Sequence, residues 1–172
     1  MSTRRKTWRD KRDLEKQPKR VRLDADFAGV KAGQMLFVGT PRLVDDYLRA
    51  IPRGETRTIE RMRRELARAH RCDATCPVST AIFLRIAAEA AWEELESGRS
   101  IDEVTPFWRA IEPGSTIAKK LRADSAFIAR QRELEGPGDA AGAKPVSKKA
   151  PAARARPRSR RAATASRGDT SA

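Results

Sequence analysis

The sequence predicts a mainly α-helical protein, in which one small winged helix-turn-helix-like domain carries a basic, disordered tail at each end. A chain of 172 residues fits one hydrophobic core with extensions. Apolar residues in the middle of the chain recur at helical spacing, whereas the ends are strongly basic. We therefore divide the chain into a basic disordered arm (1–22), a helical domain (23–136) and a basic disordered tail (137–172).

The net positive charge of the chain lies on its two ends. The chain has 37 Lys and Arg residues against 23 Asp and Glu residues. Residues 1–22 hold ten basic and three acidic side chains, and residues 137–172 hold nine and two, so each end carries +7 and the middle carries zero. A segment of +7 that neutralises phosphates gives sequence-independent binding to nucleic acid, with a log–log salt slope of about −6. The alternative is that the ends only solubilise the protein or contact ribosomes and acidic membranes.

No secretory or membrane-spanning segment is expected. The charges near the start are not followed by an apolar run, and no apolar stretch reaches the roughly 18 residues that a bilayer requires. An Arg-rich transit peptide is the alternative for residues 1–22, but this segment also contains three acidic residues. We therefore expect a cytoplasmic, nucleoid-associated protein with no membrane partner, in which Cys72 and Cys76 stay reduced.

Four helices and one short strand are expected in the middle region. Pro41 suits the first turn of a helix, Ser79 and Asp124 suit N-caps, and Gly98 suits a helix end. The Val104–Ile111 stretch contains a proline and predicts a loop or wing. The predicted elements are a strand at 34–38, helices at 41–51, 58–69, 79–97 and 124–136, and a turn at 73–77.

The helices at 58–69 and 79–97 follow each other across a short turn, which is the order of a helix-turn-helix. The second helix begins with small residues, whereas its later half carries four glutamates that phosphates would repel. We therefore expect DNA contacts from the start of this helix and from the arginines before it: Ser79, Thr80, Ala81, Arg53, Arg57, Arg61, Arg64 and Arg71. The alternative is that Arg61 and Arg64 pair with neighbouring glutamates on a solvated face.

Three collinear motifs resemble the DNA-binding domain of the alkylguanine-DNA alkyltransferase family. Ile51–Ile59 (Ile-Pro-Arg-Gly-Glu-Thr-Arg-Thr-Ile) is similar to the stretch before the family's helix-turn-helix. Thr105–Ala110 (Thr-Pro-Phe-Trp-Arg-Ala) lies where the family has its Pro-Cys-His-Arg-Val loop, and Gln131–Gly136 looks like the family's Gln-x-x-Leu-x-x-Glu-Gly ending. The resemblance covers about 36–136 and implies an alkyltransferase-like helical DNA-binding domain.

The active-site loop departs from the family in the residues that carry the chemistry. The alkyl-accepting cysteine is replaced by Phe107 and its activating histidine by Trp108, so the thiolate and base that alkyl transfer needs are absent from this loop. The resemblance is closest to the alkyltransferase-like proteins, which lack the cysteine, bind damaged DNA and pass it to other repair proteins. It implies a lesion pocket formed by Pro106, Phe107 and Trp108, with Arg109 holding a phosphate or the loop.

The resulting expectation is a non-catalytic protein that binds double-stranded DNA, recognises alkylated or distorted DNA for repair, and has other repair proteins as partners. One alternative is a histone-like packaging protein whose tails bind nucleic acid. A second is an alkyl acceptor that uses Cys76 at a helix start. The two aromatics of the 106–108 segment would otherwise pack the wing against the core. No metal or cofactor is expected, because His70, Cys72 and Cys76 lack a fourth ligand for zinc.

Overall fold

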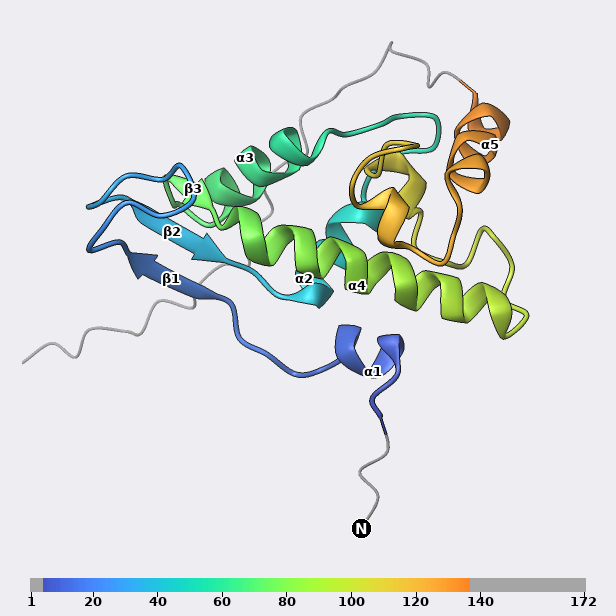
Figure 1. The fold of residues 1–172 in the computed structure, drawn as a ribbon, viewed down its shortest axis with the longest axis horizontal. Coiled ribbons are helices and arrows are strands. Elements are labelled where there is room, and N and C mark those ends of the chain that lie inside the picture. The colour runs from blue at the N-terminus through green and yellow to red at the C-terminus, as the bar shows by residue number, and fades with distance from the viewer. Residues whose placement is uncertain (1–4, 137–172) are drawn as a thin grey trace, which may run out of the picture. The chain divides into compact units, whose positions relative to one another are not determined.

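Five α-helices, two short 3-10 helices and a three-stranded sheet make up residues 5–136, the part of the chain that the computed structural model describes (Figure 1). The mainly helical fold predicted from the sequence is confirmed. The predicted disordered tail, 137–172, lies outside the described residues. The elements in chain order are α1 (Trp8–Arg12), β1 (Lys19–Arg22), β2 (Met35–Val38), α2 (Pro41–Arg49), α3 (Ile59–Ala69), β3 (Ala74–Thr75), α4 (Pro77–Glu96), η1 (Phe107–Arg109), η2 (Ala118–Lys120) and α5 (Ser125–Glu135).

Side-chain caps fix the starts of three helices where the sequence predicts them. The Thr40 hydroxyl accepts a hydrogen bond from the Leu43 N–H at the start of α2, and Thr58 does the same for Arg61 in α3. The Asp124 carboxylate accepts the Phe127 N–H at 2.6 Å at the start of α5. These bonds satisfy backbone donors that a helix leaves unpaired, which explains why the predicted boundaries are close to the observed ones.

Helix α4 forms the centre of the fold and packs on α1 and α2. It begins at Pro77 with Cys76 at the N-cap position, so the prediction that Ser79 is its N-cap is wrong by three residues. Its end near Gly98, whose φ is +92°, is confirmed. The small residues of α4 allow close packing, and the core around it contains large side chains that are less than 2% exposed: Phe37, Leu48, Met62, Leu84, Phe107, Ile111 and Ile128.

The sheet has the order β1-β2-β3, with β1 antiparallel and β3 parallel to β2. The predicted turn at 73–77 is wrong, because Ala74 and Thr75 form a strand against Leu36 and Phe37. Strand β3 therefore lies between the two helices of the expected helix-turn-helix. Helix α3 packs on the sheet, and α4 packs on α1, α2 and η1.

The predicted wing is absent from residues 97–136. This segment contains η1, η2 and α5 but no strand. Residues Val104–Phe107 are buried, because the loop before η1 runs into the core instead of over the surface. None of the helices within residues 5–136 is both long and apolar enough to cross a membrane.

The prediction that residues 1–22 form a disordered arm is wrong for α1 and β1. Thr7 and Asp10 form a capping box at the start of α1. The backbone N–H groups of Trp8 and Arg9 each donate to the Glu93 carboxylate at 3.0 Å. The segment lacks apolar periodicity, but ion pairs with α4 supply the attraction that orders it.

Arg12 is the central contact between α1 and the rest of the fold. Its guanidinium lies 2.8 Å from Glu94 and 3.9 Å from Asp45, and its side chain is only 11% exposed. Within residues 5–136, removal of this cation leaves the largely buried Glu94 with only Arg99, at 3.9 Å, whereas Asp45 keeps Arg49 at 2.9 Å. Because Glu94 loses its close partner, we expect Arg12→Ala to lower the free energy of unfolding by about 3 kcal/mol. Urea denaturation measures this change.

Arg9→Ala is the matched control, because Arg9 is 48% exposed and 3.9 Å from Glu93. We expect it to cost at most about 1 kcal/mol. Equal effects of the two substitutions would contradict the central role of Arg12.

Candidate nucleic-acid interface

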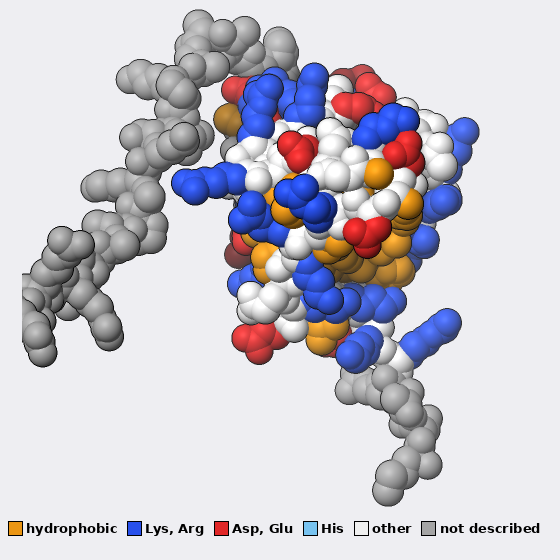
Figure 2. Space-filling model, turned by 90° about the vertical axis from the view of Figure 1, so that its left-hand side faces the viewer, with side chains coloured by type: hydrophobic (Ala, Val, Ile, Leu, Met, Phe, Trp, Pro, Cys, Tyr) orange, Lys and Arg blue, Asp and Glu red, His pale blue; other side chains and the backbone are white. Residues whose placement is uncertain are grey.

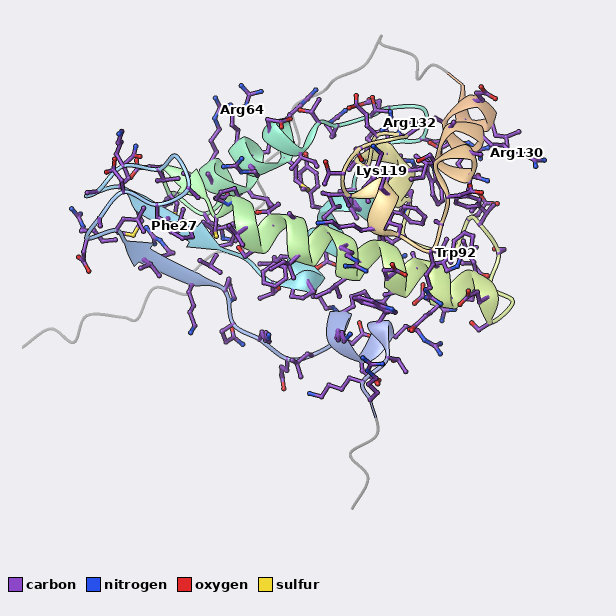
Figure 3. All side chains as sticks on the ribbon, viewed as in Figure 1. Phe27, Arg64, Trp92, Lys119, Arg130 and Arg132 are labelled. Carbon is purple, nitrogen blue, oxygen red and sulfur yellow. The ribbon has the colours of Figure 1, made fainter. Side chains whose placement is uncertain are left out.

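Helix α3 is amphipathic, with a buried face and an arginine-rich outer face. Met62, Leu66 and Ala67 face the core. Arg61, Arg64 and Arg68 follow each other at spacings of three and four residues, which places them on the opposite side of the helix. Figure 3 shows Arg64 projecting from α3 away from the other helices. Figure 2 shows Lys and Arg side chains over much of the adjoining face of the molecule, with Asp and Glu between them.

A groove of about 470 Å³ runs along α3 beside β3 and is lined by arginines, which we call the α3 groove; its lining includes Arg63, Arg64, Arg68, Cys72, Thr75, Glu60 and Asp73. The Arg63 Nε donates to the Thr75 carbonyl, and the Thr75 hydroxyl donates to the Arg63 carbonyl at 2.9 Å. These two bonds fix α3 against β3. One of the two acidic residues, Asp73, is already engaged, because it accepts the Met35 N–H at 2.7 Å.

Most of the arginines predicted to contact DNA are held by carboxylates instead. Arg61 lies 2.8 Å from Glu65, Arg57 lies 2.5 Å from Glu55, and the exposed Arg53 is 3.9 Å from Asp102. The alternative of pairing along the helix is therefore correct for Arg61.

Arg64 differs, because its side chain makes no hydrogen bond or ion pair with any residue in 5–136, and the same holds for the Arg68 side chain. Arg71 is exposed as well, at the end of α3, and its carbonyl accepts a bond from Arg20. Arg63 and Arg68 were missed by the sequence analysis. Helical spacing could have predicted Arg68 as a contact, because it lies four residues after Arg64 and therefore on the same face of the helix.

The start of α4 does not present the three small residues that the sequence analysis predicts as DNA contacts. Thr80 is 2% exposed, and its hydroxyl donates to the Cys76 carbonyl at 2.6 Å. It shares a helix face with Leu84 and Ala87, which are fully buried, so its role as a DNA contact is wrong. Ser79 and Ala81 are half-buried.

The side chains that the first turns of α4 expose are apolar. Val78 is 52% exposed and Ile82 is 53% exposed. They are four residues apart and therefore lie on one face of the helix.

The predicted lesion pocket is part of the hydrophobic core. Phe107 is fully buried and Trp108 is 2% exposed. The rings of Phe107 and Trp108 meet edge to face at 5.4 Å between centroids, and Phe127 stacks on Phe107 at 6.1 Å. Since neither ring has a free face, the alternative of aromatics that pack the loop against the core is the correct one.

Arg109 is held in the protein by a buried carboxylate that the sequence analysis missed. Its Nε and one terminal nitrogen donate to both oxygens of Glu135 at 2.8–3.1 Å, and the other terminal nitrogen donates to the Ile51 carbonyl. The Trp108 indole N–H also donates to Glu135, at 2.8 Å. Arg109 therefore ties η1 to α5 and to the segment after α2, and all three nitrogens of its guanidinium, which is 14% exposed, bond to these internal partners.

Glu135 is stabilised in its ionised form. Burial alone would raise the pKa of this carboxyl, but the hydrogen bonds from Arg109, Trp108 and the Gly54 N–H, together with the charge of Arg109, hold the pKa below its ordinary value of 4.5. The predicted residues Arg53, Pro106, Trp108 and Arg109 do meet around one cavity of about 400 Å³ beside this network. The polar atoms that Trp108 and Arg109 supply there are already used.

The glutamates of α4 are neutralised by cations from distant segments. Glu89 is 1% exposed and lies 2.8 Å from Arg122, which also reaches Glu96 at 2.7 Å. The other two, Glu93 and Glu94, hold α1. The predicted repulsion of phosphates by this half of α4 is therefore reduced by internal ion pairs.

Cys76 is a poor candidate for an alkyl acceptor. Its side chain is 7% exposed and packs in a second apolar cluster with Val30 and Leu36. A nucleophile must reach the base that it dealkylates, and this thiol has little surface to do so. Within residues 5–136 no group of three or more His, Cys, Asp and Glu side chains is placed to hold a metal ion.

Comparison of the chain with protein-family models, with curated proteins and with solved structures gave no match.

Substitution of Glu135 tests the buried network through the pH dependence of stability. The lowered pKa means that the stabilising contribution of Glu135 is fully present above pH 4.5 and is lost as the pH falls toward the folded-state pKa. We expect Glu135→Gln to reduce the free energy of unfolding at pH 7 by about 2–3 kcal/mol and to flatten its decrease below pH 4.5. Denaturant unfolding over a pH series measures both effects.

Glu133→Gln is the control for this prediction, because it leaves Glu135, the partner of Arg109 and Trp108, in place. We expect it to unfold like the wild type at pH 7. If the free energy of unfolding of Glu135→Gln decreased below pH 4.5 as steeply as that of the wild type, the Glu135 carboxylate would not contribute to this pH dependence.

Proposed function

We propose that this protein binds double-stranded DNA without catalysis, and that the outer face of α3 is its folded contact surface. The observation that carries the proposal is that the side chains of Arg64 and Arg68 have no partner among residues 5–136, beside a groove that also includes Arg63. Arginines that make no ion pair in the protein are the ones available to phosphate oxygens.

The geometry of α3 suits a phosphate backbone. Arg64 and Arg68 are separated by one helical turn, about 6 Å along the axis. Successive phosphates of one strand are spaced on the same scale, so two arginines on one helix face can contact neighbouring phosphates. Helices α3 and α4, with β3 between them, form the helix-turn-helix-like unit of this proposal.

The tail 137–172 supplies a second, sequence-independent contribution. Its charge of +7 attracts a polyanion through counterion release. A tail and a folded surface on the same chain reinforce each other, because binding of one raises the local concentration of the other near the duplex. The tail therefore adds affinity, and α3 orients the domain.

A preference for alkylated or distorted DNA is the finer part of the proposal and is based on the family resemblance over 36–136. Because Phe107 and Trp108 are core residues, such a preference would act through the shape and deformability of the duplex and not through an aromatic pocket. In that case we expect other repair proteins as partners, and we expect the protein to be cytoplasmic and associated with the nucleoid.

DNA packaging is the second candidate, and the burial of the predicted lesion pocket favours it. In this case the tails bind intact and damaged duplexes alike, and the folded domain mediates protein contacts. The two candidates differ in whether the α3 arginines contribute to DNA binding.

Substitution of the two unpaired arginines tests the α3 surface. We expect Arg64→Ala with Arg68→Ala to weaken binding to a short duplex by about tenfold or more at moderate salt and to reduce the log–log salt slope by about 2. Fluorescence anisotropy over a salt series gives both quantities.

The matched control removes two other cations that have no partner within residues 5–136, Lys119 on η2 and Arg130 on α5 (Figure 3). Lys119→Ala with Arg130→Ala changes the net charge by the same amount. If the two double variants lose equal affinity, net charge and not the α3 surface determines binding.

Truncation after Gly136 separates the tail from the folded domain. We expect the shortened chain to lose about 6 from the salt slope and still to be weakened by the α3 substitutions. Any preference for an alkylguanine-containing duplex over an intact one should remain in the shortened chain. Loss of all DNA binding on truncation would favour the packaging candidate.

A further inference from the structure

Strand β1 is rich in positive charge, and no strand among residues 5–136 pairs with its outer edge. It is the outer strand of the sheet, and all four of its residues, Lys19–Arg22, are exposed. No acidic side chain interrupts the sequence Lys-Arg-Val-Arg. Figure 1 shows β1 at the lower edge of the sheet, on the side of β2 away from β3.

The register of the sheet identifies the backbone groups on this edge. The Met35 N–H, the Met35 carbonyl and the Phe37 carbonyl all bond to the segment 73–76, on the β3 side of β2. In an antiparallel pair only alternate residues exchange backbone bonds. The β1 residues opposite Met35 and Phe37 are Arg22 and Arg20, so these two direct their N–H and carbonyl groups away from β2.

A row of unpaired N–H and carbonyl groups on an edge strand is a template for another strand. The side chains around this template decide which strand it accepts. Three of the four are cationic, and the fourth, Val21, is 43% exposed and offers an apolar contact. Like charges placed opposite each other destabilise a strand pair, whereas opposite charges stabilise it.

These charges exclude the two occupants that the chain itself supplies. A second copy of β1 would place Lys and Arg against Lys and Arg. The tail 137–172 carries +7 and would be repelled in the same way. An extended segment with acidic residues that alternate with apolar ones complements both the charges and Val21.

We propose that the outer edge of β1 binds an acidic extended segment of another protein by strand addition, through the backbone groups of Arg20 and Arg22. Backbone bonds give the affinity, and the three cations select an acidic sequence. This inference does not depend on DNA binding by α3.

The first experiment uses the full chain and a fluorescent, end-capped peptide in which Glu and Val alternate. We expect Arg22→Ala to weaken binding by about two- to fivefold through the lost cation. Arg22→Pro loses the same cation and also the outward N–H, so we expect about a further fivefold or greater loss. The bonds from β1 to β2 are made by the alternate residues, so proline is tolerated at this edge position.

Arg20→Ala and Arg20→Pro form a second matched pair, because both also lose the bond from Arg20 to the Arg71 carbonyl. Hydrogen exchange on the wild-type chain needs no substitution. The peptide should slow exchange of the Arg20 and Arg22 amides about tenfold or more and leave Val21, which is already bonded to β2, unchanged.

Three results would overturn the proposal. The first is equal peptide affinity of the proline and alanine variants, and the second is unchanged exchange at Arg20 and Arg22 with the peptide bound. The third is a failure of the peptide to bind while Arg22→Ala weakens binding of a duplex, which would assign this edge to nucleic acid. A peptide with Lys in place of Glu is the control and should not bind.

Discussion

The ion pairs between the glutamates of α4 and cations from distant segments hold the described part of the chain together. Glu93 and Glu94 order α1, and Glu89 orders the segment around Arg122 before α5. These carboxylates are largely buried, so each needs a cation and hydrogen bonds to offset its desolvation. The chain therefore places its first and last helices by charge as well as by apolar packing.

This use of charge determines which arginines remain for binding. Arg12, Arg109 and Arg122 are committed to internal carboxylates, and Arg61 is paired along its own helix. The side chains of Arg64 and Arg68 have no such partner in the part of the chain that the structure describes. All of these arginines carry the same charge in the sequence. Their contacts in the structure show which ones stabilise the fold and which ones are available to bind a ligand.

The parts of the fold that the sequence predicts are those set by local rules. The helices at 41–51, 58–69 and 124–136 have apolar periodicity and a Thr or Asp cap, and the structure confirms them within about two residues. Helix α1 has no apolar period, but its capping box between Thr7 and Asp10 was readable in the sequence. Its docking on Glu93 was not, because the partner is more than 80 residues away.

The candidate site was harder to predict than the fold, because burial decides the role of each residue. An aromatic loop next to a proline gives no sign of whether its rings face solvent or the core. The structure places Phe107 and Trp108 in the core, where Glu135 holds both Trp108 and Arg109. The sequence analysis includes Glu135 only within the Gln131–Gly136 motif and gives it no role, because spacing alone does not show which side chains it contacts.

Zero net charge in 23–136 does not prevent this region from binding a polyanion. At physiological ionic strength a charge is felt over about 8 Å, so a phosphate responds to the side chains near it and not to the sum over the domain. Near the α3 groove these are three arginines and two carboxylates: Arg63, Arg64, Arg68, Glu60 and Asp73. Asp73 is already bonded to the backbone of β2, so the cations are in excess there. The glutamates on α4 are compensated by their own cations, so their effect on a phosphate at α3 is weaker still. Under the DNA-binding proposal, the distribution of paired and unpaired charges, rather than their total, therefore sets where the duplex contacts the folded domain.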